Sequence, residues 1–106
     1  MLQERRNQCL GLVRISNRQL NKVRYYPGEG NTHGLMKAVL CERLEKQGKF
    51  YVTEAVIDKI GTRADILVLD DFLVIEIAVT ESESSLEEKR EKYESIGLKM
   101  GVVRCS

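Results

Sequence analysis

The chain has 106 residues and a formal net charge of +1 at pH 7. This length suffices for one domain with a single hydrophobic core and is too short for two. No apolar run approaches the roughly 20 residues of a membrane span, and the first residues lack the apolar segment of a secretory signal. The three cysteines are widely spaced, which predicts neither a zinc site nor a disulfide framework. We therefore expect a soluble, cytoplasmic protein without membrane association.

Positive charge is concentrated in the first 26 residues, which have a balance of +5, whereas the remaining residues sum to −4. The basic side chains of this segment are Arg5, Arg6, Arg14, Arg18, Lys22 and Arg24. Residues 8–26 have the pattern of a polar β-hairpin, and the PGEGN segment that follows predicts a loop. We expect residues 1–31 to form a basic hairpin and loop, and residues 32–106 the core. Such an arm is typical of a phosphate-binding protein whose acids hold metal, and also of a plain solvated hairpin.

A first helix is predicted from Thr32, as its cap, to about residue 47, ending before Gly48. Its apolar face, at helical spacing, consists of Leu35, Met36, Val39, Leu40 and Leu44. His33 and Lys37 stand four residues apart on one edge of this face. His33 is the only histidine, so it has no histidine partner for a metal site; a phosphate contact, a capping contact or a plain surface position are the alternatives.

Residues 50–58 predict a strand that ends in a turn around Ile60 and Gly61. Pairing through this turn would place Val56 opposite Asp65, with Glu54 on the same face and one pleat step away. Glu54 would then point toward Asp65, although a slip of one residue would turn it to the other face.

The stretch RADILVLDDFLVIEIAVTES, residues 63–82, predicts two apolar strands joined by a tight turn at Asp70 and Asp71. Two acids interrupt the strands, and the pairing places them, Asp65 and Glu76, directly opposite each other. Opposed side chains lie roughly 4.5–5.5 Å apart at Cβ, where like charges destabilise a sheet. A divalent cation between the carboxylates would compensate for the repulsion; the alternative is a pair of acids solvated at the rim of the sheet.

A second helix follows, beginning at Ser84 and Ser85 with a capping-box pattern. Its inward stripe contains Leu86, Tyr93 and Ile96, and helical spacing places Lys89 in the middle of that stripe. A lysine there extends outward along apolar surface or faces a negative group. Residues 99–105 predict a last strand. The order of elements predicts an α/β fold with an antiparallel meander, one parallel strand and flanking helices.

The segments HGLMK, RADILV and VIEIAVTES resemble the nuclease-like domain of the competence protein CoiA. The helix, three strands, helix and strand also resemble the PD-(D/E)XK nuclease superfamily, which includes restriction endonucleases and Holliday-junction resolvases. The resemblance covers residues 33–104. It implies a restriction-endonuclease-like mixed sheet with an αβββαβ core, here preceded by the N-terminal hairpin.

Carried over by position, the resemblance makes Asp65 and Glu76 the metal-binding carboxylates for Mg²⁺ or Mn²⁺, with the carbonyl of Ile77 as a further ligand. Glu54, or alternatively Glu42 on the first helix, would supply the additional acid found in many members. The family's lysine lies two residues after the glutamate, where this chain has Ala78. Lys89 is our candidate for the missing cation.

These features predict a metal-dependent nuclease that hydrolyses phosphodiester bonds, as a DNA endonuclease. The expected nucleic-acid contacts are Arg5, Arg6, Arg14, Arg18, His33 and Lys37, whose binding to phosphates would be salt-dependent. Because the chain has few aromatic residues, we do not expect base stacking to dominate binding. An inactive nucleic-acid-binding or assembly module, or a structural subunit, would also account for Ala78. The choice between DNA and RNA is left open; cutting both strands of a duplex would suit a homodimer.

Overall fold

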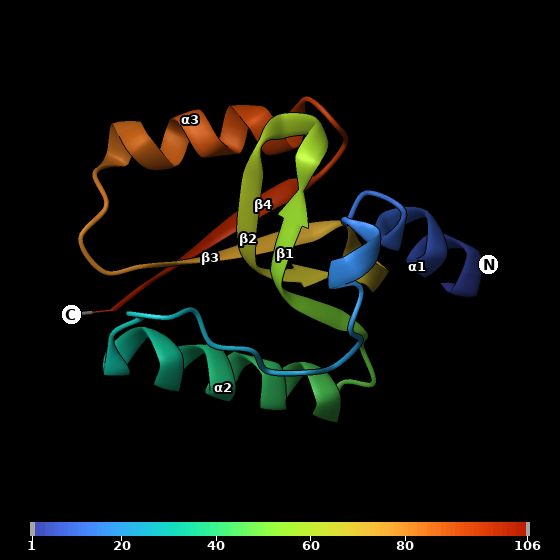
Figure 1. Ribbon diagram of the computed structural model, residues 1–106, viewed down its shortest axis with the longest axis horizontal. Helices are drawn as coiled ribbons and strands as arrows, with labels where there is room; N and C mark the ends of the chain where they lie inside the picture. The colour runs from blue at the N-terminus through green and yellow to red at the C-terminus, as the bar shows by residue number, and fades with distance from the viewer. Residues whose placement is uncertain (1, 106) are drawn as a thin grey trace.

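A mixed β-sheet separates the helices of the protein, whose computed structural model describes residues 2–105 (Figure 1). The four strands lie in chain order across the sheet: β1 (Tyr51–Ile57), β2 (Thr62–Val68), β3 (Leu73–Ala78) and β4 (Lys99–Arg104). The first three strands form an antiparallel meander, and β4 joins β3 in parallel through helix α3 (Glu83–Glu94). This arrangement confirms the predicted α/β fold with a meander and one parallel strand. None of the helices within residues 2–105 has the length and apolar character needed to cross a bilayer.

Two hydrophobic clusters cover the two faces of the sheet. Helix α2 (Asn31–Lys46) packs on one face, in a cluster that contains Cys41, Leu44, Tyr51, Ile66, Val68 and Ile77. Helix α3 packs on the other face, in a cluster that includes Leu86, Tyr93, Val52, Leu67, Val74 and Ala78. Because successive residues of a strand face opposite sides, strands covered on both faces are apolar at nearly every position.

The N-terminal segment is helical, and the hairpin predicted over residues 8–26 is wrong. Helix α1 (Leu2–Leu10) is followed by a 3₁₀ turn, Ile15–Asn17. The chain then runs beside β1, where Asn21 exchanges two hydrogen bonds with the backbone of Tyr51, at 2.8 and 2.9 Å. Farther along, the Thr53 hydroxyl accepts a hydrogen bond from the N–H of Arg24 at 2.9 Å. Since β1 and its side chains supply these hydrogen bonds, the segment is ordered without a second strand of its own.

The four arginines that we expected to contact nucleic acid have partners within the protein. Arg6 pairs with Asp70 at 2.9 Å, and Arg5 donates to the Asp70 carbonyl at 2.8 Å, so α1 is attached to the β2–β3 turn. Arg14 pairs with Asp58, and Arg18 donates to the carbonyl of Val13. The contribution of these side chains to nucleic-acid binding stays a prediction.

The buried face of α2 differs from the predicted apolar face. The helix begins at Asn31 after a Gly30 cap, so Thr32 is not its cap, and Leu35 is 69% exposed. The buried residues of α2 are Gly34, Lys37, Cys41 and Leu44, and Met36 and Leu40 pack against the same cluster, so Met36, Leu40 and Leu44 of the predicted face are confirmed. The apolar pattern missed Lys37 because it treats lysine as a solvent-facing residue, whereas this lysine is held inside the protein by acidic partners.

Helix α3 and the strand register agree more closely with the sequence. The inward positions of Leu86 and Tyr93 are confirmed, although the cap is Ser82, whose hydroxyl accepts from the N–H of Ser85 at 3.2 Å. Leu67 pairs with Val74 as predicted. In the first hairpin, however, Val56 lies opposite Arg63 rather than Asp65, because the connection is a short 3₁₀ turn, Asp58–Ile60.

Candidate active site

The two central acids, Asp65 and Glu76, lie where β2 separates from β3. The β1–β2 ladder continues to the pair Ile57 and Thr62, whereas the β2–β3 ladder ends at Ile66 and Ile75. At the next position the carboxylates replace the ladder. The N–H of Asp65 donates to Oε2 of Glu76 at 3.1 Å, and the N–H of Ile77 donates to Oδ2 of Asp65 at 2.7 Å. Asp65 and Glu76 are therefore in direct contact across the two strands.

A cleft of about 650 Å³ opens at this separation, between the start of α2 and the inner face of α3. Four acidic side chains line it: Glu29, Glu54, Asp65 and Glu76. The basic side chains that line it are Arg63, Lys89 and Lys92, and His33 lies at the same wall. The cleft thus combines several carboxylates with nearby cations, which is suitable for a ligand that carries both metal and phosphate.

Glu76 is the most buried acid of the cleft, at 2% exposure. Burial, followed by the charge of Asp65, raises its pKa to about 7. The ammonium of Lys89 opposes this rise from 3.1 Å, across the face of β3 on which Ala78 also lies. Helical spacing predicted that Lys89 faces inward. The structure places its ammonium on Glu76, and Ala78 stands two residues after Glu76, where the family has its lysine.

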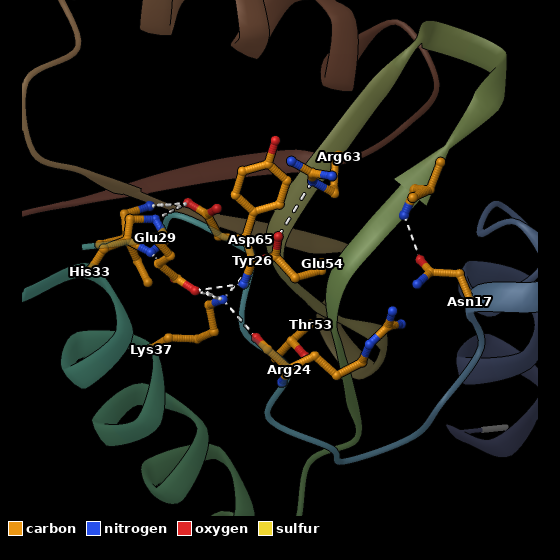
Figure 2. Close-up of polar contacts among 12 residues, drawn as sticks. Asn17, Arg24, Tyr26, Glu29, His33, Lys37, Thr53, Glu54, Arg63 and Asp65 are labelled. Carbon is orange, nitrogen blue, oxygen red and sulfur yellow. Dashed lines mark hydrogen bonds and ion pairs between the residues drawn. The ribbon is translucent and has the colours of Figure 1, made fainter. Parts of the chain in front are cut away.

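The buried Lys37 connects the acids Glu29 and Glu54 on the side of the cleft nearest α2. Lys37 has no exposed surface, and its Nζ donates to Oε2 of Glu54 at 2.8 Å, to Oε1 of Glu29 at 3.0 Å and to the carbonyl of Arg24 at 2.7 Å (Figure 2). Burial alone would lower the pKa of Lys37, but the hydrogen bonds to Glu54 and Glu29 outweigh it and raise that pKa. Lys37 has no exposed surface in the structure, and its expected contact with nucleic acid stays a prediction.

His33 connects this buried cluster to the central acids. Its Nδ1 contacts the carboxylate of Glu29, and its Nε2 lies 3.3 Å from Oδ2 of Asp65 (Figure 2). The side chain is 19% exposed, so it forms part of the cleft wall. A chain of polar contacts therefore runs from Lys37 through Glu29 and His33 to Asp65.

Glu54 marks a break in the alternation of β1. Its φ is +50°, in the left-handed region that a residue with a side chain seldom adopts, and no ladder pair forms at this position. After it, Ala55 packs in the same cluster as Val52, although a regular strand would place them on opposite faces. Lys37 at 2.8 Å and Arg63 at 3.4 Å hold the Glu54 carboxylate in the cleft.

The structure brings together most of the predicted site residues, namely Asp65, Glu76, Lys89, Glu54, Ile77 and His33. It leaves out Glu42, which is exposed and pairs with Lys46 on the outer side of α2. The predicted phosphate-binding arginines Arg5, Arg6, Arg14 and Arg18 do not line the cleft either. Sequence reasoning missed Glu29, whose position four residues before His33 and eight before Lys37 was the available signal.

The donor atoms at the separation suit a hard cation. Within residues 2–105, no group of three His, Cys, Asp or Glu side chains is arranged to hold a metal ion. The site instead offers the carboxylates of Asp65 and Glu76, and the backbone of Ile77. Because the N–H and C=O of a strand residue point to the same neighbour, the Ile77 carbonyl faces β2 along with its N–H. Two carboxylates and a carbonyl fit Mg²⁺, which keeps several waters as its other ligands.

A comparison with family models identifies the chain. The model of the competence protein CoiA, nuclease-like domain, matches residues 29–101. The chain belongs to this family. The match begins at Glu29 and includes every residue that lines the cleft except Tyr26, whereas the N-terminal arginines lie outside it. No curated protein and no solved structure matches the chain. The resemblance to the CoiA nuclease-like domain is therefore confirmed, and the wider PD-(D/E)XK assignment stays a prediction.

Replacing the buried lysine should destabilise this nuclease-like domain. Lys37→Met leaves the carboxylates of Glu29 and Glu54 without their shared partner, so we expect a loss of roughly 3 kcal/mol or more in the free energy of unfolding by urea. The control is Lys46→Met on the same helix, where the side chain is 75% exposed and the change should stay within about 0.5 kcal/mol. Similar values for both variants would contradict a structural role for Lys37.

The buried Glu76 should make stability depend on pH. Its pKa is raised from 4.5 to about 7, so the folded protein retains a proton that the unfolded chain releases in this range. The stabilisation is complete below pH 4.5 and is lost as the pH rises through 7. For the wild type in EDTA, the free energy of unfolding by urea should fall by roughly 3 kcal/mol between a pH below 4.5 and a pH above 7.

Glu76→Gln should remove this pH-dependent loss, since glutamine does not titrate. Glu87→Gln, at a side chain that is 61% exposed, is the matched control and should follow the wild type. A Glu76→Gln variant that loses stability over the same pH range would show that another group is responsible.

Proposed function

We propose that this protein is a metal-dependent nuclease of the PD-(D/E)XK type that hydrolyses phosphodiester bonds in DNA as an endonuclease. The observation that carries the proposal is the contact of Asp65 with Glu76 where β2 leaves β3, with the Lys89 ammonium 3.1 Å from Glu76. Membership in the CoiA nuclease-like family supports the same reaction class. The cations of the cleft would face the DNA phosphates.

Asp65, Glu76 and the Ile77 carbonyl would hold Mg²⁺ or Mn²⁺. When bound, such an ion offsets the negative charge of the phosphate and lowers the pKa of water. The protein contributes fixed orientation: Asp65 accepts the N–H of Ile77 at 2.7 Å, and Glu76 accepts the N–H of Asp65 at 3.1 Å. These hydrogen bonds hold both carboxylates against their mutual repulsion before any ligand arrives.

Lys89 would supply the positive charge that Ala78 cannot. Its side chain is 39% exposed and comes from α3, so the ammonium can contact both Glu76 and a phosphate oxygen in the cleft. A fixed cation beside the reacting phosphate stabilises the charge that grows in the transition state. Lys89 would thereby act from α3 where related nucleases use a lysine on the strand itself.

Ala78 also supports a second function, a nucleic-acid-binding or assembly module that has kept the fold and lost catalysis. Its side chain is fully buried against α3 and offers no group to orient water. Binding without cleavage would distinguish this module from a nuclease. In the nuclease case, cutting both strands of a duplex would be served by a homodimer, which light scattering with and without DNA would reveal.

Loss of either central carboxylate should abolish cleavage. We expect the wild type to cut members of a panel of single-stranded, duplex and branched DNA with Mg²⁺ or Mn²⁺, and to stop in EDTA. Asp65→Asn and Glu76→Gln should show no metal-dependent cleavage while retaining their circular dichroism spectra. Asp71→Asn, an acid that pairs with Lys49 at the β2–β3 turn, is the control and should cut normally. Cleavage by either carboxylate variant in a contaminant-free preparation would exclude the proposed site.

Removing the ammonium of Lys89 should slow turnover without disturbing packing. Lys89→Met keeps the length of the side chain, and the loss of one electrostatic donor should lower the rate by roughly 10²-fold or more. Lys92→Met, one turn away and exposed at the same cleft, should lower it far less. Equal rates for Lys89→Met and the wild type would mean that Lys89 does not replace the family's lysine.

A further inference from the structure

Two hydroxyl groups of the cleft lack hydrogen-bond partners among the described residues. They belong to Tyr93 on α3 and Thr62 at the start of β2, and both residues line the cleft. Tyr93 has no exposed surface as a residue. A buried hydroxyl without a partner costs free energy, and folded proteins seldom retain one without a reason. A buried hydroxyl without a partner can therefore indicate a place where a ligand supplies that partner.

The two hydroxyls lie beside the central acids. Tyr93 follows Lys89 by four residues on α3, so the two side chains share the inner face of the helix. Thr62 precedes Asp65 by three residues on β2. The Thr62 hydroxyl lies close enough to lower the pKa of Tyr93 as a weak hydrogen-bonding neighbour, although neither hydroxyl has a partner with full hydrogen-bond geometry. The site of the proposed reaction is thus flanked by two hydroxyls from different elements whose hydrogen bonding is incomplete.

The chemistry of these groups favours an anionic ligand. Burial raises the pKa of Tyr93, so its hydroxyl keeps its proton at neutral pH and can donate it to a hydrogen bond. A carboxylate ligand would gain little beside Glu76 and Asp65, whereas a phosphate held by a cation at those acids would bring oxygen acceptors to this place. Lys89, which is 39% exposed and lies one turn before Tyr93 on α3, adds a cation beside the two hydroxyls.

We propose that the Tyr93 hydroxyl, supported by that of Thr62, binds a non-bridging phosphate oxygen of the nucleic acid in the cleft. This inference rests on the proposed function, because it takes the phosphodiester substrate as the ligand. Tyr93 is then a substrate-binding residue whose hydroxyl has no role in holding the fold. The ordinary alternative, a core tyrosine with a structural hydroxyl, predicts the opposite behaviour when that oxygen is removed.

Tyr93→Phe separates the two roles because it deletes only the oxygen. If the hydroxyl awaits a ligand, the melting temperature of the ligand-free protein should stay equal or rise, while kcat/KM for the preferred DNA falls about 10-fold, as expected for one lost hydrogen bond in the transition state. Tyr51→Phe is the matched control. Its hydroxyl is also buried without a partner, but it lies in the α2 cluster, away from the cleft. Its melting temperature should behave in the same way and its kcat/KM should not change.

A binding measurement makes the test independent of cleavage. In a Glu76→Gln background, fluorescence anisotropy with labelled single-stranded and duplex DNA should show binding weakened roughly 3- to 10-fold by Tyr93→Phe, and unchanged by Tyr51→Phe. Weaker binding together with a wild type that never cuts would sustain the role of Tyr93 and remove the nuclease proposal. Normal cleavage and normal binding by Tyr93→Phe, a fall in its melting temperature, or no DNA binding by any variant would overturn the role of Tyr93.

Discussion

The cleft depends on one buried ammonium. Lys37 on α2 joins the segment that precedes this helix to β1, since it contacts the carbonyl of Arg24 and the carboxylate of Glu29 on one side and Glu54 on the other. A buried cation is tolerated only when acceptors surround it, and the acceptors in turn are tolerated only because the cation is there. The cluster therefore fixes the loop before α2 against the sheet and keeps the backbone of Glu54 in its left-handed conformation, so that the acids of the cleft converge.

A second constraint is the repulsion between acids at the separation of β2 and β3. Asp65 and Glu76 replace ladder hydrogen bonds with their own carboxylates, which holds like charges together in a buried place. The protein offsets this with the Lys89 ammonium and with a raised pKa at Glu76. Such an arrangement is costly to a fold with no ligand to bind, and it would suit the metal-assisted reaction on a phosphodiester that we propose.

The sequence predicted the central part of the site because local rules apply there. In a hairpin the tight turn fixes the register of the two strands, and this register brings Asp65 to Glu76. Helical periodicity then oriented Lys89 inward. The same rules failed on α2, where a buried lysine took the place of an apolar residue, and in the N-terminal segment, where β1 supplied hydrogen bonds that no local pattern encodes.

From residue 31 onward the sequence by itself determined the order of the elements, the antiparallel meander and its parallel fourth strand. It also determined the two acids and the lysine of the proposed reaction. Each of these follows from spacing within one or two neighbouring elements. Only the tertiary structure decided that Glu29, His33 and Lys37 form one network with Asp65, and that Tyr93 and Thr62 present unpaired hydroxyls to the cleft. These features arise where segments distant in the sequence meet, and their energies depend on burial and on charges that exist only after the chain has folded.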